Sequence, residues 1–340
     1  MRTHPLLAQT IEALQKSPRR WLVTGAAGFI GSHLVEQLLQ MNQKVAGIDN
    51  FATGYKKNLD DIQARVRSAL WKNFEFFEDD ICNFESCQRA ARGAQVVLHH
   101  AALGSVPRSI ANPQATNAVN VGGTINVLMA AKEQKDVRVI SASSSSVYGD
   151  NDDLPKVESR TGRPLSPYAV SKAAGELYAK VFSEVYNLEI ISLRYFNVFG
   201  GRQNRLGPYA AVIPQWITAL MSGEDIIVHG DGSTSRDFCY VKNVVQMNLL
   251  AATTNNREAF GQVFNTAFDA KTSLTELLSS LQRRVPDCKS RVIHQERRPG
   301  DISHSQASIE LARRLLGYQP QYDIQAGLDE TVEWYRGSRS

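Results

Sequence analysis

The chain contains 340 residues, of which 43% are hydrophobic and 21% charged, and its formal net charge is +4. This composition excludes a disordered chain, and the positive charge is too small and too dispersed to indicate a nucleic-acid partner. No apolar run reaches the length of a membrane span, so we expect no membrane partner and a location in the cytoplasm.

Residues 1–20 carry apolar side chains at helical spacing, among them Leu7 and Leu14. Thr10 and Glu12 interrupt the apolar run, which makes this stretch a poor signal peptide. We expect a helical extension here, lying against the edge of the domain that follows.

The next stretch joins an apolar strand, Trp21–Val23, to an amphipathic helix through three glycines. Gly25, Gly28 and Gly31 are three residues apart, so the G-x-G-x-x-G fingerprint of dinucleotide-binding folds is not met literally. A turn without Cβ atoms lets a ligand approach the backbone, and the helix N-terminus behind it favours a pyrophosphate. For the glycines alone, a plain turn between strand and helix stays the alternative.

A second predicted strand, Lys44–Asp49, ends on an acid. A carboxylate at this distance from the glycines accepts both hydroxyls of an adenosine ribose, and it would repel a 2′-phosphate. No arginine directly follows Asp49, so the sequence favours NAD over NADP. A solvated aspartate at a strand end is the ordinary alternative, and the coincidence of strand, glycines, helix and acid weakens it. The polar loop Asn50–Gly54 is placed to touch the adenosine.

Further apolar segments alternate with helical ones as far as residue 200, which predicts an α/β fold with a doubly wound parallel sheet. The predicted strands are 74–81, 95–102, 137–146 and 190–195, and a long helix is predicted at 120–131. Asp80 and Ile81 end the first of these strands near the expected adenine. Ala101 and Ala102 end the second and leave room for a dinucleotide at the switch point of the sheet.

The alternation ends at Gly200 and Gly201, after which loops lengthen and prolines and glycines become frequent. We therefore expect an NAD-binding Rossmann domain at 21–200 and a smaller α/β domain at 201–340 that mainly binds the substrate. A return of the chain to the first domain near 237–265 stays open.

Residue types that often bind metals give no such pattern here. The chain has four cysteines, which form no C-x-x-C pair and no cluster with histidine: Cys82, Cys87, Cys239 and Cys288. We interpret them as reduced thiols and expect no metal. His99 and His100 lie in an apolar strand, so we interpret both as core residues.

The segment S-P-Y-A-V-S-K places Tyr168 and Lys172 four residues apart, on one side of a predicted helix. A lysine charge lowers the pKa of a phenol, which suits removal of a proton from a hydroxyl at neutral pH. Such a pair alone is common on solvated helix faces, but this one follows a dinucleotide fold and a strand ending in serines. Ser144 and Ser145 are candidates for donating to the reacting oxygen, while Ser143 and Ser146 are interpreted as structural.

Together these motifs resemble the extended short-chain dehydrogenase/reductase superfamily, and most of all its nucleotide-sugar epimerases. The resemblance also includes the runs Arg194–Asn197, Gly230–Val241 and Arg297–Asp301, and it extends from Trp21 to about Tyr335. In that family, the last two runs hold a UDP-sugar. Arg236 and Arg298 can bind a pyrophosphate, and Asp301 can accept from the uridine ribose. Either arginine could instead be a surface ion-pair partner.

The motifs and the resemblance together predict three sets of site residues. The catalytic residues are Ser144, Tyr168 and Lys172. The residues expected to contact NAD are Gly25, Gly28, Phe29, Ile30, Asp49, Asn50, Thr53, Gly54, Asp80, Ile81, Ala101, Ala102, Asn120, Tyr168, Lys172 and Tyr195. The residues expected to contact the UDP-sugar are Ser105, Ser144, Ser145, Asn197, Ala211, Val212, Trp216, Arg236, Arg298, Asp301 and Ser305.

The resemblance implies that Tyr168 removes the proton of the sugar 4-hydroxyl while hydride passes from C4 to tightly held NAD. The 4-keto sugar then turns over, and hydride returns to its opposite face. Sugar 4,6-dehydratases carry an acid pair beside the catalytic serine or threonine, where this chain has Ser145 and Ser146. Elimination of water therefore lacks its acid and base.

The predicted substrate pair is UDP-N-acetylglucosamine and UDP-N-acetylgalactosamine. Galactose-specific epimerases carry a bulky tyrosine at the family position that Ser305 occupies here, and a serine opens room for an N-acetyl group. Together with the residue 1–20 extension, the segments Ala101–Ile110 and Tyr209–Pro214 resemble bacterial UDP-N-acetylglucosamine 4-epimerases of surface-polysaccharide pathways such as lipopolysaccharide O-antigen synthesis. Ser305 could equally be an ordinary helix-cap serine in a promiscuous enzyme.

Other functions stay open at this stage. On the same scaffold they are a UDP-glucose/UDP-galactose 4-epimerase and a UDP-hexuronic acid 4-epimerase or decarboxylase. From another class, an NAD(H)-sensing binding protein is the alternative, although such a protein has no need of a Y-x-x-x-K pair. The resemblance also implies a homodimer, formed through helices near 113–131 and 168–186, unless their apolar faces pack on the sheet.

Overall fold

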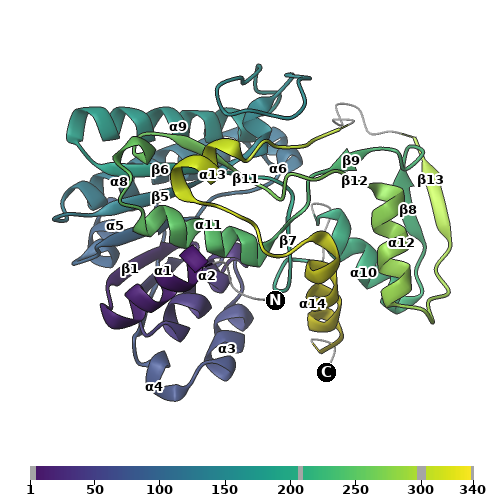
Figure 1. The fold of residues 1–340 in the computed structure, drawn as a ribbon, viewed down its shortest axis with the longest axis horizontal. Helices are drawn as coiled ribbons and strands as arrows, with labels where there is room; N and C mark the ends of the chain where they lie inside the picture. The colour runs from purple at the N-terminus through teal and green to yellow at the C-terminus, as the bar shows by residue number, and fades with distance from the viewer. Residues whose placement is uncertain (1–4, 206–209, 297–303, 338–340) are drawn as a thin grey trace.

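A computed structural model of the chain describes residues 5–205, 210–296 and 304–337. Its main body is a seven-stranded parallel sheet with the strand order β11-β6-β5-β4-β1-β2-β3, and helices cover both faces (Figure 1). The strands are β1 Arg20–Thr24, β2 Lys44–Asp49, β3 Phe74–Glu78, β4 Val96–His99, β5 Arg138–Ser144, β6 Glu189–Tyr195 and β11 Val263–Thr266. The predicted α/β fold with a doubly wound parallel sheet is confirmed.

Two layers of helices bury the faces of this sheet because each helix carries one apolar side. On one face lie α1 Pro5–Lys16, α2 Phe29–Gln40, α3 Lys56–Arg65 and α11 Val241–Thr253. On the other lie α5 Phe84–Ala91, α8 Thr124–Lys132 and α9 Pro167–Tyr186. The strand order reverses between β1 and β4, which pair with each other at the centre. In such sheets, ligands bind at the carboxyl ends of the strands beside that reversal.

The predicted strands ran past their true ends in three places. The strands end at Glu78, His99 and Ser144, although single backbone hydrogen bonds still run from the amide of Asp79 to Asp49 and from the amide of His100 to Thr24. The bend after β4 is held by Thr24, whose hydroxyl accepts from the amides of His100 and Ala101.

The predicted helix at 120–131 is also not uniform. Residues Ala118–Gly123 form a π-helical turn that leads into α8. A Cβ on Gly123 would lie 2.5 Å from Cδ1 of Ile81, so this turn sits close against the end of the β3 segment. The wider turn contains Asn120, whose amide oxygen accepts from the amide of Leu103 and whose amide nitrogen donates to the hydroxyl of Ser171.

Helix α1 lies against α11 and the main core, with Leu7 and Leu14 buried. Gln43, directly before β2, ties the end of α1 to β1. Its side-chain amide donates to the carbonyl of Leu14 and accepts from the indole of Trp21.

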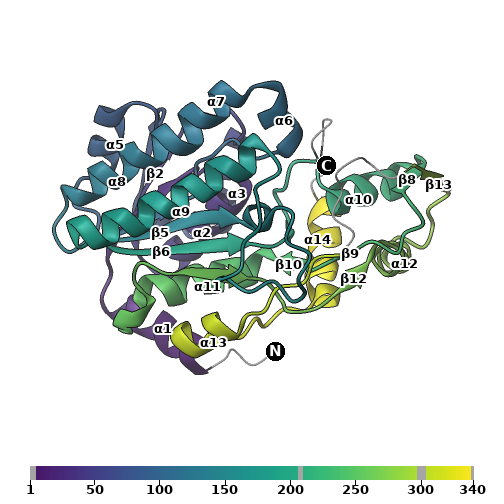
Figure 2. The same cartoon turned by 90° about the horizontal axis from the view of Figure 1, so that it is seen from above.

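A smaller lobe follows β6 and has its own apolar core (Figure 2). Its helices are α10 Val212–Ser222, α12 Leu274–Arg284 and α14 Ile324–Gly337. Its short strands pair as β8 Ile226–His229 with β13 Val292–Gln295, β9 Ser235–Arg236 with β12 Thr272–Ser273, and β7 Val198–Phe199 with β10 Cys239–Tyr240. Between these elements the chain returns to the main sheet to supply α11, β11 and later α13 Glu310–Leu316.

Short helices complete the connections: α4 Ser68–Trp71, α6 Val106–Ala111, α7 Pro113–Asn117, and the 3-10 turns Ser145–Tyr148 and Arg257–Ala259. Among the described residues, no helix combines the length and the apolarity that a membrane crossing requires.

Candidate active site

The glycine-rich turn between β1 and α2 leaves no room for side chains. Gly25 has a φ of +70°, and a Cβ there would lie 2.8 Å from the amide nitrogen of Ala101. A Cβ on Gly31 would lie 2.0 Å from the carbonyl oxygen of Gly25. Helix α2 begins at Phe29 after Gly28, and no side chain caps it. The helix N-terminus is therefore open to an anion, and the turn fits a dinucleotide pyrophosphate.

Asp49 is held rigidly at the carboxyl end of β2. One of its carboxylate oxygens accepts from the amide of Ala27 at 2.9 Å, and the other accepts from the amide of Phe51 at 2.8 Å. Burial raises the pKa of Asp49 above its usual value, while these amide bonds act against that rise. Gly54 passes so close that a Cβ there would lie 2.9 Å from both carboxylate oxygens. Each oxygen keeps a further lone pair, as the acceptor of a ribose diol must.

Asn50 and Asp80 meet at the next strand end, where the amide of Asn50 donates to the carboxylate of Asp80 at 2.8 Å. The structure thus brings together the predicted adenosine-side residues of two neighbouring strands. Thr53 is exposed in the same loop, while Ile81 is buried behind it.

Two residues predicted to contact NAD have their polar atoms engaged within the protein. Asn120 uses its side-chain amide to join Leu103 to Ser171. The hydroxyl of Tyr195 lies 2.7 Å from Nε2 of His100 and accepts from the amide of Asn248 at 2.9 Å. His99 lies between the hydroxyls of Thr24 and Thr124. Burial lowers the pKa values of His99 and His100 to about 3, so both are neutral; His99 is a core residue, while His100 is half-buried.

Tyr168 and Lys172 stand on the first turns of α9, facing the end of β5. Ser166 caps this helix by accepting from the amide of Ala169 at 3.1 Å, and Pro167 begins it. Lys172 donates to the carbonyl of Ala142 at 2.9 Å, and the side chains of Tyr168 and Ser144 share a hydrogen bond. The predicted constellation of serine, tyrosine and lysine is therefore assembled at one place.

The pKa values of this constellation differ from the expectation of a lowered phenol pKa. Burial raises the pKa of Tyr168 above its usual value, and the hydrogen bond from Ser144 only partly offsets the rise. Burial also lowers the pKa of Lys172 to about 8, against the opposing charge of Glu176. The reason is that both groups, although half-buried, are largely surrounded by protein, where the charged forms lose hydration.

The predicted sugar-side residues fall into two groups in space. Ser105 has a φ of 122° and caps α6, while Ser145 begins the turn directly after Ser144. Arg236 and Ser305 belong to neighbouring segments, because the amide of Ser305 donates at 3.1 Å to the carbonyl of Ser235, directly before Arg236.

Asn197 lies beside the segment that carries Arg236, since its side-chain amide donates to the carbonyl of Asp237 at 3.0 Å. Ala211 and Val212 begin α10. Trp216 lies one turn further, but it is only 3% exposed in the core of the smaller lobe. Its indole donates to the carbonyl of Ile227, so the structure gives it a packing role. Arg298 and Asp301 lie outside the described residues.

Sequence reasoning assigned no role to two buried acids beside these segments. Glu176, on α9, pairs with Arg194 and accepts from the hydroxyl of Ser143. Asp237 is fully buried and accepts from the amides of Phe268, Asp269 and Ala307. The spacing of Glu176, four residues after Lys172, was a usable signal. Nothing near Asp237 in the sequence predicts partners so far along the chain.

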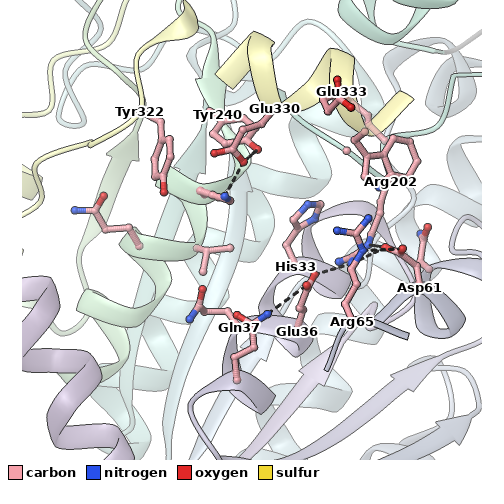
Figure 3. Close-up of a pocket in the computed structure, with 18 of the residues that line it drawn as sticks. His33, Glu36, Gln37, Asp61, Arg65, Arg202, Tyr240, Tyr322, Glu330 and Glu333 are labelled. Carbon is pink, nitrogen blue, oxygen red and sulfur yellow. Dashed lines mark hydrogen bonds and ion pairs between the residues drawn. The ribbon is translucent and has the colours of Figure 1, made fainter. Parts of the chain in front are cut away.

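A cavity of about 910 Å³ lies away from all these residues, between the outer sides of α2 and α3 and the helices α11 and α14 (Figure 3). Its charged side chains are largely engaged with one another. Arg202 contacts Glu36 and Asp61, each at 2.6 Å, and Lys242 contacts Glu330 at 2.6 Å. The described residues contain no cluster of three or more side chains suited to a metal ion.

Comparison with known proteins gives consistent matches over nearly the whole chain. Residues 21–267 match the model of the NAD dependent epimerase/dehydratase family. A putative UDP-glucose 4-epimerase of Methanocaldococcus jannaschii is 35% identical over 318 residues, covering 93% of this chain and 98% of that protein.

Two solved structures are similar in fold and sequence. One is a UDP-N-acetylglucosamine 4-epimerase from Methanobrevibacter ruminantium M1 in complex with UDP-N-acetylmuramic acid, at a TM-score of 0.87 and 36% identity, covering 94% of this chain and 99% of that one. The other is a UDP-glucuronic acid 4-epimerase from Bacillus cereus in complex with UDP-glucuronic acid and NAD, at a TM-score of 0.84 and 30% identity, with coverage of 94% and 99%.

Proposed function

Because the chain belongs to the NAD dependent epimerase/dehydratase family, we propose that it interconverts UDP-N-acetylglucosamine and UDP-N-acetylgalactosamine. It is an NAD-dependent nucleotide-sugar 4-epimerase, as the sequence predicted. The relatives act on several UDP-sugars, and the choice of the N-acetylated pair is the proposal. The enzyme class sets aside the alternative of an NAD(H)-sensing protein.

The residues around the β1–α2 turn fit NAD. The turn from Gly25 to Gly31 admits a pyrophosphate against backbone, and Asp49 offers the acceptors for the adenosine ribose. Bound there, NAD supplies a reversible hydride acceptor. The chain positions it, with Asn50 and Asp80 on the adenine side and Lys172 on the side of the reaction.

Tyr168 holds and releases the proton of the sugar 4-hydroxyl in this proposal. Its phenol shares a hydrogen bond with Ser144, which gives the reacting oxygen a second partner and a path for the proton. Lys172 stabilises the phenolate by its charge and is fixed by the carbonyl of Ala142. Because the phenol is half-buried and its pKa raised, bound ligands that exclude water would strengthen its dependence on the Lys172 charge.

The preference for an N-acetylated sugar depends on Ser305. Its backbone is tied to Ser235, next to Arg236, so its position is fixed relative to the residue expected to hold the diphosphate. A small side chain here leaves space that a larger one would fill. The 36% identical epimerase named for UDP-N-acetylglucosamine supports the same choice.

The test is to incubate purified enzyme, without added NAD, with UDP-N-acetylglucosamine and separately with UDP-glucose, following the anomeric protons by NMR. We expect the N-acetylated substrate to have the higher kcat/KM. In a Ser305→Tyr variant, kcat/KM for UDP-N-acetylglucosamine should fall about tenfold or more, while activity on UDP-glucose is kept. The matched control is Ser308→Tyr, further along the same segment. Turnover of UDP-glucose alone by the wild-type enzyme would refute the N-acetyl proposal.

We also infer that the enzyme is a homodimer, because α9 presents an unpacked apolar stripe. Leu177, Val181 and Val185 are 67%, 49% and 65% exposed, at helical spacing and on the side of α9 away from Tyr168 and Lys172. Helix α8, by contrast, buries its apolar side against the sheet. A second copy of the same stripe would cover this surface by two-fold symmetry.

A further inference from the structure

The last three residues of β5 each contact a different turn of α9. The carbonyl of Ala142 accepts from Lys172, the hydroxyl of Ser143 donates to Glu176 at 2.5 Å, and Ser144 shares its hydrogen bond with Tyr168. Of these three contacts, only the one between Ser143 and Glu176 involves no proposed catalytic residue.

Glu176 is tied equally firmly from the other side. Arg194, on β6, donates Nε to one carboxylate oxygen at 2.9 Å and Nη2 to the other at 2.7 Å. The two side chains are 5% and 10% exposed, which makes this a buried, bidentate ion pair. Arg194 also donates to the carbonyl of Glu158 and lies 4.8 Å from the ring centre of Tyr148.

A buried ion pair contributes little net stability compared with apolar side chains of the same size, so its presence calls for another explanation. The location supplies one, since Glu176 joins the strand end that carries Ser144 to the helix that carries Lys172. We propose that Glu176, balanced by Arg194, is a positioning residue that fixes Ser143 and thereby Ser144, and that keeps the ammonium of Lys172 charged.

Charged and titratable groups of several elements surround this pair. Lys172 on α9 faces Glu176, while Tyr148 after β5 and Glu158 in the loop that follows face Arg194. His99 on β4 and His100 directly after it lie near Lys172. The two histidines are neutral, so Glu176 supplies the charge that opposes Lys172, and Arg194 in turn balances Glu176. Removing either should move the titration of Tyr168 and Lys172, and the two removals should act in opposite directions.

The test uses the full-length enzyme and the variants Glu176→Gln, Arg194→Gln and the double variant. Glu176→Gln should move the alkaline limb of the kcat profile to lower pH by about one unit, because an uncompensated cation remains beside Lys172. Its kcat should fall about tenfold with KM within about twofold. Arg194→Gln should move the limb to higher pH, and the double variant should return it close to the wild-type position.

A second readout does not depend on turnover. The tyrosinate absorbance of each variant is titrated and compared with the same variant carrying Tyr168→Phe, which isolates the phenol of Tyr168. Its midpoint should move in the same directions as the limb. Glu176→Asp, which keeps the charge but shortens the reach to Ser143, should lower kcat and leave the limb in place.

Glu189→Gln is the matched control. It breaks the 2.6 Å ion pair between Arg138 and Glu189. This pair joins the first residues of β5 and β6, at the opposite ends of these strands from Ser143 and Arg194. Equal shifts in this control, or limbs that stay in place in folded Glu176→Gln and Arg194→Gln proteins, would overturn the proposal. The proposal depends on the roles given above to Tyr168 and Lys172. Those roles fail separately if Tyr168→Phe retains wild-type turnover, and the pH profiles use any UDP-sugar that is converted.

Discussion

Asp237 is a single buried carboxyl that ties three separate segments of the chain together. Its oxygens accept from the amides of Phe268, Asp269 and Ala307. Burial is the main cause that raises its pKa, to about 7, while these amide bonds act to lower it. A carboxyl pKa raised on folding means that the folded protein binds more protons than the unfolded chain between about pH 4 and pH 7.

This excess of bound protons predicts a stability that depends on pH. The contribution of Asp237 is fully present below the unfolded pKa and is lost as pH rises through about 7. Asp237→Asn should flatten this slope, which urea unfolding at pH 5 and pH 8 measures. Asn can replace only part of the acceptor set, so the variant should also be less stable at pH 5. Exposed Asp152→Asn is the control. An equal slope in Asp237→Asn and wild type would contradict the prediction.

Single residues could be predicted where their partners are close in sequence or where the residue type is unusual for its place. Asp49 ends its strand, and Tyr168 and Lys172 share a helix, so the sequence alone predicts which elements surround these residues. Trp216 shows where prediction from the sequence fails. An aromatic side chain beside a substrate segment could face either way, and its burial depends on a lobe core that includes residues of α12 and α14, far along the chain.

At the scale of elements, the β1–α2 turn is a tightly constrained connection. A Cβ on Gly31 would meet backbone, the carbonyl of Gly25 at 2.0 Å, and no side-chain rotation can relieve that contact. By contrast, nothing lies within 4 Å of a Cβ on Gly122, which is also helical. Gly122 can therefore accept a side chain, whereas Gly31 cannot do so without movement of the backbone.

We expect Gly31→Ala to lower the free energy of unfolding by about 1–3 kcal/mol and to weaken NAD retention, because the turn must open to admit the methyl group. Gly122→Ala should leave NAD content unchanged. Differential scanning calorimetry and the NAD released on denaturation measure both effects. NAD content equal to wild type in purified Gly31→Ala would show that the turn adapts and that its close fit is not needed for binding.

Strand and helix positions were predictable from the alternation of apolar segments, but their ends were not. Side-chain patterns do not record where backbone hydrogen bonding stops, so β3, β4 and β5 are shorter than predicted. The π-helical turn before α8 was also missed. It reflects long-range contacts, the approach of Gly123 to Ile81 and the bonds of Asn120 to Leu103 and Ser171, that no local pattern contains.

At the scale of the whole molecule, α9 serves two surfaces at once. Tyr168, Lys172 and Glu176 face the sheet, and the apolar stripe faces outward. The double variant Leu177→Glu and Val185→Glu should convert the proposed dimer to a monomer, because two charges would then be buried at the interface. Light scattering after gel filtration measures the mass. Ile293→Glu, on the smaller lobe, is the control, and a monomeric wild-type enzyme would refute the dimer.

The order of strands in the main sheet also has a consequence for how the protein is made. β6 pairs with β5 on one side and with β11 on the other, and β11 comes from residues 263–266. Until the ribosome has released those residues, the nascent chain carries β6 as an open parallel edge, the kind of surface that pairs with foreign strands. Chains that terminate before residue 263 should therefore aggregate even though they contain the whole glycine turn and the proposed catalytic residues Ser144, Tyr168 and Lys172.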